Sequence, residues 1–171
     1  WARTSRRVSL SDARSAAEAA ARIGATEPGA DGTRVGIGFR DGLWADAPTL
    51  TVLDAATGGI PTFLLSADLH SIWLNSAAFA RTGRSAPADG ILREDEAFAV
   101  MRSLEHGDAA ALDACVADAA ADAAARGIVG VVDLDMEWNE DAWARRISGG
   151  FDALRVEFGI YPDHLERAVA E

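Results

Sequence analysis

The chain contains no lysine, and all 16 of its basic residues are arginine. This absence excludes a Schiff-base lysine and a carbamylated lysine that bridges two metal ions. The chain also has a single cysteine, Cys115, so it cannot form an intrachain disulfide, which is typical of the reducing cytoplasm. Cys115 lies in an alanine-rich helical pattern, where we expect a small core residue.

Basic surface and long apolar runs are also scarce. The net charge is -11 at pH 7, which argues against nucleic acid and anionic membranes as partners, because both bind basic surfaces. No run approaches the ~20 apolar residues that span a bilayer. No apolar segment of a signal peptide follows the arginines near the N-terminus. We therefore expect a cytoplasmic protein.

The compact motifs of metal and cofactor binding are missing as well. The sequence has no HxH, HExxH or CxxC pattern, no GxSxG and no phosphate-binding loop. The segment VGIGF at 35–39 contains G-x-G, but it lacks the third glycine and the helix of a dinucleotide fingerprint. We therefore predict that this chain itself holds no metal or cofactor.

What is present is an alternation of helical and strand patterns. Hydrophobic residues make up 49% of the chain, enough for a sizeable core in one domain or one domain plus an appendage. The second half reads helix, strand, helix, strand, helix, which indicates a parallel sheet and an α/β fold. Strands are expected at 34–39, 62–65, 128–132 and 154–160, and helices at 9–24, 49–56, 75–81, 93–104, 108–126 and 139–148.

Polar and aromatic side chains gather in the stretch SADLHSIWLNSAAFA, which we place at a joint between a strand and a helix. Functional groups collect just past the carboxyl ends of parallel strands, and a carboxylate can fix the tautomer of a histidine. Alternatively, a side chain of the stretch caps the helix, the indole packs in the core and the asparagine bonds to nearby backbone. The candidate substrate-binding residues are Asp68, His70, Trp73 and Asn75.

A second polar group follows the strand predicted at 128–132. Asp133, Asp135 and Glu137 would lie on one side if that strand continued, because side chains alternate along a strand. Such carboxylates could bind a cation or accept hydrogen bonds from a substrate, and we include Asp133 and Asp135 among the candidate substrate-binding residues. The alternative is a solvated exit loop whose carboxylates favour the N-terminus of the next helix.

Several stretches, in order along the chain, resemble the amidohydrolase superfamily in its branch called amidohydrolase family 3. The family's first barrel helix is similar to VSLSDARSAAEAAARIG, and its GxGWdxxxW segment to VGIGFRDGLW, with Phe39 in place of the usual tryptophan. Its segment pTradLDaatggrPvxlxxxdgHsxwvNSxAL is similar to PTLTVLDAATGGIPTFLLSADLHSIWLNSAAFARTG, and its GvLrExA to GILREDEAFAVM. Two successive barrel strands resemble AAARGIVGVVDLDME and LRVEFGIYPDHLE. Matching positions are Asp54, Pro61, His70, Trp73, Asn75 and Ser76.

The resemblance implies a fragment of a longer, TIM-barrel metal-dependent hydrolase that cleaves amide, formamide or similar non-peptide C–N bonds. The family's HxH metal ligands would lie shortly before Trp1, and its later ligands beyond Glu171, so a divalent metal, zinc, is implied for the full-length parent only. The implied segments are barrel helix 1 in residues 1–24, an α/β insertion subdomain in 25–107 and a partial (β/α) barrel in 108–171. The insertion would line the pocket that binds the small-molecule substrate of the parent.

Two interpretations of the function follow. The first is a piece of a hydrolase that carries a pocket wall without the metal centre, and the second is a non-catalytic α/β binding or assembly module. An HxH motif encoded just upstream would support the first, whereas a natural start codon at Trp1 would exclude it. The strands at 128–132 and 154–160 can pair with each other and leave apolar edges open, so we also predict self-association.

Overall fold

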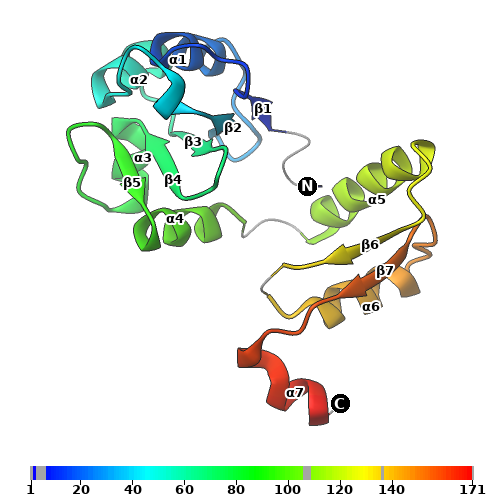
Figure 1. Ribbon diagram of the computed structural model, residues 1–171. Helices are drawn as coiled ribbons and strands as arrows, with labels where there is room; N and C mark the ends of the chain where they lie inside the picture. The colour runs from blue at the N-terminus through cyan, green and yellow to red at the C-terminus, as the bar shows by residue number, and fades with distance from the viewer. Residues whose placement is uncertain (1, 3–6, 106–108, 136, 171) are drawn as a thin grey trace. The chain divides into compact units, whose positions relative to one another are not determined.

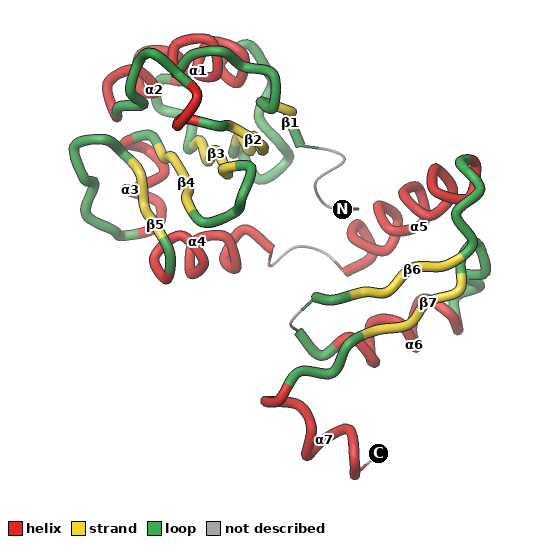
Figure 2. The backbone as a smooth tube through the Cα atoms, viewed as in Figure 1, coloured by secondary structure: helices red, strands yellow, loops and turns green. Residues whose placement is uncertain are grey.

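The computed structural model describes residues 2, 7–105, 109–135 and 137–170 (Figure 1). The chain divides into two compact units, one within Arg6–Gly107 and the other within Asp108–Glu171. Each unit combines helices with its own sheet, which confirms the predicted α/β class (Figure 2). No helix in the described ranges is long and apolar enough to cross a membrane.

The first unit is built on a five-stranded mixed sheet in the order β1-β2-β3-β4-β5. The strands are β1 Val8–Ser9, β2 Arg34–Phe39, β3 Thr62–Ser66, β4 Ser71–Leu74 and β5 Ile91–Arg93. β1, β2 and β3 run parallel to one another, whereas β3 with β4 and β4 with β5 pair antiparallel. β3 lies at the centre and is buried along its whole length. It is therefore the strand on which both faces of the core depend.

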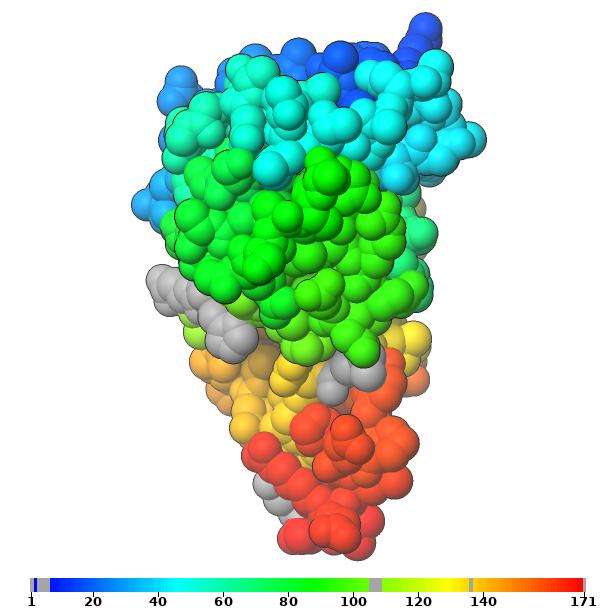
Figure 3. Space-filling model, turned by 90° about the vertical axis from the view of Figure 1, so that its left-hand side faces the viewer, coloured from blue at the N-terminus to red at the C-terminus, as the bar shows by residue number. Residues whose placement is uncertain are grey.

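Helices pack against both faces of this sheet. Figure 3 shows from one side the closely packed blue-to-green atoms of this unit. They are α1 Ala16–Gly24, the short helix η2 Asp41–Leu43, α2 Leu50–Thr57, α3 Ser76–Thr82 and α4 Asp95–Glu105. Leu64 and Trp73 pack with residues of α1 and α2 in one apolar cluster. Phe63 and Ile72 pack with residues of α3 and α4 in the other. Because side chains alternate along β3 and β4, successive residues of each strand pack into different apolar clusters.

The second unit follows the predicted alternation of helix and strand. Its elements are α5 Ala109–Ala125, β6 Gly130–Asp133, α6 Asn139–Ser148, β7 Arg155–Phe158, the short helix η3 Pro162–His164 and α7 Leu165–Ala170. β6 and β7 pair in parallel, as predicted, and Val131 lies opposite Val156. The apolar cluster of this unit is small, and consists of Ala120, Ala123 and Leu154 with Val131 and Phe151 packed against it.

Most of the large apolar side chains that the structure shows as exposed lie in this second unit. Val132 on β6 is 61% exposed, and Val169 on α7 is 87% exposed. The others in the unit are Ile128, Val129, Leu134, Ile147, Ile160 and Leu165. Among the described residues, the second unit therefore leaves more of its large apolar side chains in water than the first unit does.

The prediction that β3 leads directly into a helix is wrong, because the chain first forms a β-hairpin. β3 turns back into β4 with Leu65 opposite Ile72, and α3 begins only after Leu74 and the capping residue Asn75. The run SIWL has four residues, too few for its pattern to separate a strand from the first turn of a helix. The polar stretch therefore has two ends, one at a hairpin turn and one at a helix cap.

Two helix starts also differ from the prediction. The first helix does not begin at Ser9, which lies in β1, but after Ser15, whose Oγ accepts a hydrogen bond from the Glu18 amide. Ser15 and Glu18 have the spacing of a capping box, so the correct start was present in the sequence. Arg93 belongs to β5 instead of a helix, and α4 begins at Asp95.

The predicted segments ended after residues 24 and 107. The boundary between the two compact units falls between Gly107 and Asp108. α1, which ends at Gly24, packs in the same apolar cluster as α2. A division after residue 24, between a barrel helix and an insertion, stays a prediction.

Candidate functional site

The turn of the β3–β4 hairpin is built around the carboxylate of Asp68. Its Oδ1 accepts hydrogen bonds from the Ser66 hydroxyl at 2.6 Å and from the His70 amide at 3.0 Å. These two donors, the hydroxyl first, lower the pKa of Asp68 below its usual range. Leu69 between them has a φ of 63°, a left-handed conformation that non-glycine residues seldom adopt. The turn thus holds an ionised carboxylate and the neighbouring imidazole at the surface.

His70 is paired with a carboxylate from a distant part of the chain. Its Nδ1 lies 3.1 Å from Oε2 of Glu94, the residue between β5 and α4. The amide of Glu94 also donates a hydrogen bond to the His70 carbonyl at 2.9 Å. The ring of Phe98 on α4 stands edge-on to the imidazole, with the centroids 5.6 Å apart. The side chain of His70 nevertheless remains 59% exposed, so it is accessible to a ligand.

Glu94 raises the pKa of His70, chiefly through the side-chain hydrogen bond and then through the attraction of its charge. Sequence analysis did not select Glu94. The stretch GILREDEAFAVM, which resembles a family segment, was the signal that could have identified it. The sequence expectation was that Asp68 would orient the imidazole, but Asp68 bonds to the backbone of His70 and the ring is bonded by Glu94.

Asn75 lies at the other end of the stretch and is fully buried. Its Oδ1 accepts hydrogen bonds from the amides of Thr62 at 3.0 Å and Ala78 at 2.9 Å, the second of which caps α3. Its Nδ2 donates to the Thr57 hydroxyl at 2.9 Å and to the Ile60 carbonyl at 2.8 Å. These bonds use both the donors and the acceptor of the amide and join β3, α2 and α3. This geometry favours the alternative in which Asn75 holds the fold together.

Trp73 is fully buried too, in the apolar cluster beneath α1 and α2. Its ring makes edge contacts with Phe39, at 6.3 Å between centroids, and with Trp44, at 6.4 Å. Its Nε1 has no hydrogen-bond partner among the residues that the structure describes. Of the four candidates in the stretch, Asp68 and His70 thus lie together at the surface, whereas Trp73 and Asn75 lie in the interior. A role for the interior pair in substrate binding stays a prediction.

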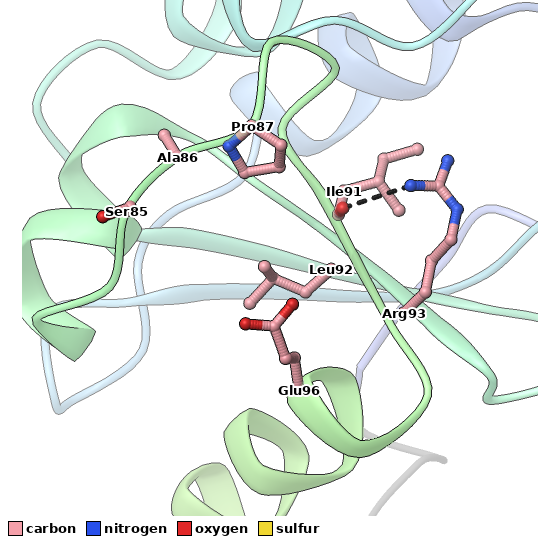
Figure 4. A pocket seen from close by; sticks show the side chains of 7 residues that line it. All are labelled: Ser85, Ala86, Pro87, Ile91, Leu92, Arg93 and Glu96. Carbon is pink, nitrogen blue, oxygen red and sulfur yellow. Dashed lines mark hydrogen bonds between the residues drawn. The ribbon is translucent and has the colours of Figure 1, made fainter.

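Two shallow hollows lie beside β5, with volumes of about 390 and 450 Å³. Leu92, Arg93 and Glu96 help to line the smaller one (Figure 4). Arg93 Nη1 donates to the Ile91 carbonyl at 3.3 Å, and the Ile91 amide donates to Asp89 at 3.1 Å. An ion pair between Arg93 and Asp89, 2.9 Å apart, joins these two side chains. They therefore cover backbone groups of Ile91 on an end strand of the sheet.

The acidic group after β6 is arranged as a turn. β6 ends at Asp133, so the alternation that would align Asp133, Asp135 and Glu137 does not continue. The Asp133 carboxylate accepts hydrogen bonds from the Asp135 amide at 3.1 Å and from Trp143 Nε1 at 2.9 Å. Asp135 in turn accepts from the Glu137 amide at 3.4 Å. Among the described residues, no group of three or more His, Cys, Asp or Glu could hold a metal ion.

Comparison with known proteins adds a family. The sequence model of the amidohydrolase family matches residues 1–149. The fold is similar to that of an uncharacterized metal-dependent hydrolase from Pyrococcus horikoshii OT3, with a TM-score of 0.74 and 16% identity over 99% of this chain and 36% of that one. A second such hydrolase, from Pyrococcus furiosus, gives a TM-score of 0.70 and 17% identity, over 99% of this chain and 37% of that one. No curated protein matches the sequence.

The chain spans little more than a third of the length of these two solved structures. At such low identities the structural likeness shows the shared fold alone. The family match rests on the sequence itself and extends over most of both units. The matching positions of the resemblance, including His70 and Asn75, lie within the matched range, whereas the segment LRVEFGIYPDHLE lies beyond it. The chain therefore belongs to the amidohydrolase family.

Proposed function

We propose that this chain is part of a metal-dependent hydrolase that cleaves a non-peptide C–N bond of an amide or a formamide. The observation that carries the proposal is the family match over residues 1–149. The fold likeness to two metal-dependent hydrolases supports it. On this proposal α5, β6, α6, β7 and α7 are a segment of a TIM barrel, and a cytoplasmic location is supported by the single cysteine.

We propose that a divalent metal, zinc, is held elsewhere in the parent hydrolase. The described residues of this chain do not fit a metal centre, because they offer no cluster of three ligating side chains. Asp133, the carboxylate best placed at a strand end, already accepts two hydrogen bonds. Zinc centres need three or four converging ligands. This chain would therefore contribute to substrate binding, and the metal ligands would lie elsewhere in the parent.

The proposed contribution of the chain is a polar wall of the substrate pocket formed by Asp68 and His70. Both side chains are exposed, and both are held in place by hydrogen bonds. Preorganised polar groups of this kind fix the orientation of a small molecule at little entropic cost. Asp135, exposed at the end of β6, is a second candidate for contact with a substrate, together with Asp133.

A non-catalytic assembly module is the second candidate function, and the exposed apolar side chains of the second unit favour it. These side chains also support self-association of the isolated chain, because they remain in water until another surface covers them. Light scattering over a wide range of concentrations tests this proposal. A species that stays monomeric throughout would contradict it.

The hydrolase proposal is tested with the whole protein that carries this sequence. Elemental analysis after dialysis should find a stoichiometric divalent metal. The protein should also hydrolyse members of a panel of formamides, N-acyl amines and cyclic amides, with loss of activity on chelation and recovery when metal is returned. Absence of both bound metal and hydrolysis would overturn the proposal in favour of the assembly module.

A further inference from the structure

Backbone strain in the described residues is concentrated around one side chain. Leu69, with a φ of 63°, and Glu94, with a φ of 49°, are the non-glycine residues found there with a positive φ. Leu69 precedes His70 in the hairpin turn, and Glu94 bonds to His70 from the start of α4. Left-handed conformations of this kind are unfavourable for residues with a side chain, and they cluster at functional sites. The strain is therefore a reason to ask what the pairing of His70 with Glu94 achieves.

Glu94 holds His70 at two points. Its amide fixes the backbone of His70 through the bond to the carbonyl, and its carboxylate fixes the ring through Nδ1. A carboxylate accepts hydrogen bonds and cannot donate them, so Nδ1 must carry the proton. In the neutral imidazole, Nε2 is then left with a lone pair. No described residue forms a hydrogen bond with Nε2.

We infer that Glu94 is a positioning residue that holds His70 as the Nδ1–H tautomer, so that Nε2 accepts a hydrogen bond from an N–H group of the substrate. This inference rests on the proposed function and adds the kind of substrate group that the polar wall selects. Asp68 and Glu94 place two negative charges around the imidazole, and Phe98 of α4 adds none. Such surroundings disfavour anionic substrates and favour a neutral amide N–H or a cationic amine.

The tautomer of His70 can be measured directly on the chain by ¹⁵N-detected NMR of the histidine rings. The pH must lie above the pKa of His70, so that its imidazole is neutral. In the natural sequence we expect Nδ1 of His70 to show the ¹⁵N chemical shift of a protonated ring nitrogen. We expect Nε2 to show the chemical shift of an unprotonated ring nitrogen. Glu94→Ala should remove this preference and lower the pKa of His70. Glu94→Gln should keep the tautomer, because its amide oxygen still accepts from Nδ1, while lowering the pKa.

Glu96→Gln is the matched control, because Glu96 lies two residues further on, is 66% exposed and pairs with Arg84 instead of His70. This variant should leave the tautomer and the pKa of His70 unchanged. His164, whose ring faces Trp138 at 5.8 Å, serves as an internal reference in every spectrum. A His70 ring with its proton on Nε2 in the natural sequence would overturn the inference. So would a tautomer and pKa that are the same in Glu94→Ala as in the natural chain.

Kinetics of the whole hydrolase separate this inference from the function on which it rests. If both hold, Glu94→Ala lowers kcat/KM for substrates with an N–H donor by about tenfold, the loss of one hydrogen bond of ordinary strength. Glu94→Gln should recover most of it. An N-methylated substrate that lacks the N–H should show no such dependence on Glu94. If the NMR result is as expected but no hydrolysis occurs, the tautomer stands and the proposed function fails.

Discussion

The two ends of the stretch SADLHSIWLNS have opposite environments. At the hairpin turn, Asp68 and His70 are exposed, and His70 takes its ring partner, Glu94, from another part of the chain. Only a few residues later, Trp73 and Asn75 are fully buried, and every polar atom of the Asn75 side chain is bonded within the fold. Both ends belong to the segment that resembles the family. A residue that matches the family pattern can therefore be either buried within the fold or exposed at the surface.

The difference shows how burial separates these two uses. A buried amide that meets all of its hydrogen-bond partners inside the protein has no capacity left for a ligand. An exposed imidazole with one bonded and one open nitrogen does have that capacity. The hairpin turn is therefore the part of the first unit where we expect changes to affect function, and the cap of α3 is the part where we expect them to affect stability.

The largest effect on stability is expected for Asn75→Ala. This change leaves the buried amide of Thr62 without an acceptor and removes the cap of α3, so the free energy of unfolding should fall by about 2–4 kcal/mol. Urea denaturation followed by circular dichroism measures it. Ser76→Ala is the matched control, because the neighbouring Ser76 is exposed and its hydroxyl bonds to Asp54 at the surface. Equal losses in the two variants would refute the difference drawn here.

A smaller effect, and one that depends on pH, is expected for the pair formed by His70 and Glu94. Because Glu94 raises the pKa of His70 in the folded chain, the imidazolium stabilises the fold. This stabilisation is complete below the pKa of an unfolded histidine, about 6.5, and disappears as the pH rises through the raised pKa. Melting temperatures measured across this window should show a decline that is reduced in Glu94→Gln. If the melting temperature of Glu94→Gln declines as much as that of the natural chain, other titrating groups cause the decline.

Much of the fold could be predicted because local signals agreed with tertiary packing. The strand expected at 62–65 and the helices expected at 49–56 and 75–81 lie within one residue of β3, α2 and α3, and β6 pairs with β7. The hairpin was missed because β4 is a four-residue apolar run next to a helix. Its identity as a strand is decided by pairing with β3 and β5, which no local pattern reveals.

Some residues of the candidate site could be selected from the sequence and others could not, for similar reasons. His70 and Asp68 could be selected because their side-chain chemistry is visible in the sequence. Glu94 could not be assigned to His70, because the two are 24 positions apart and meet only through the sheet. The burial of Trp73 and Asn75 also depends on how β4 packs between β3 and β5. Exposure, which separates a binding residue from a structural one, is a property of the assembled fold.

The most direct test of this account compares His70→Ala with Asn75→Ala in the whole hydrolase, with both the melting temperature and kcat/KM measured for each. We predict that His70→Ala keeps a melting temperature close to that of the natural protein at pH 8 and loses kcat/KM by about tenfold or more. Asn75→Ala should melt at a clearly lower temperature and keep its kcat/KM per folded molecule. A His70→Ala variant with lowered stability and unchanged kcat/KM would contradict the account.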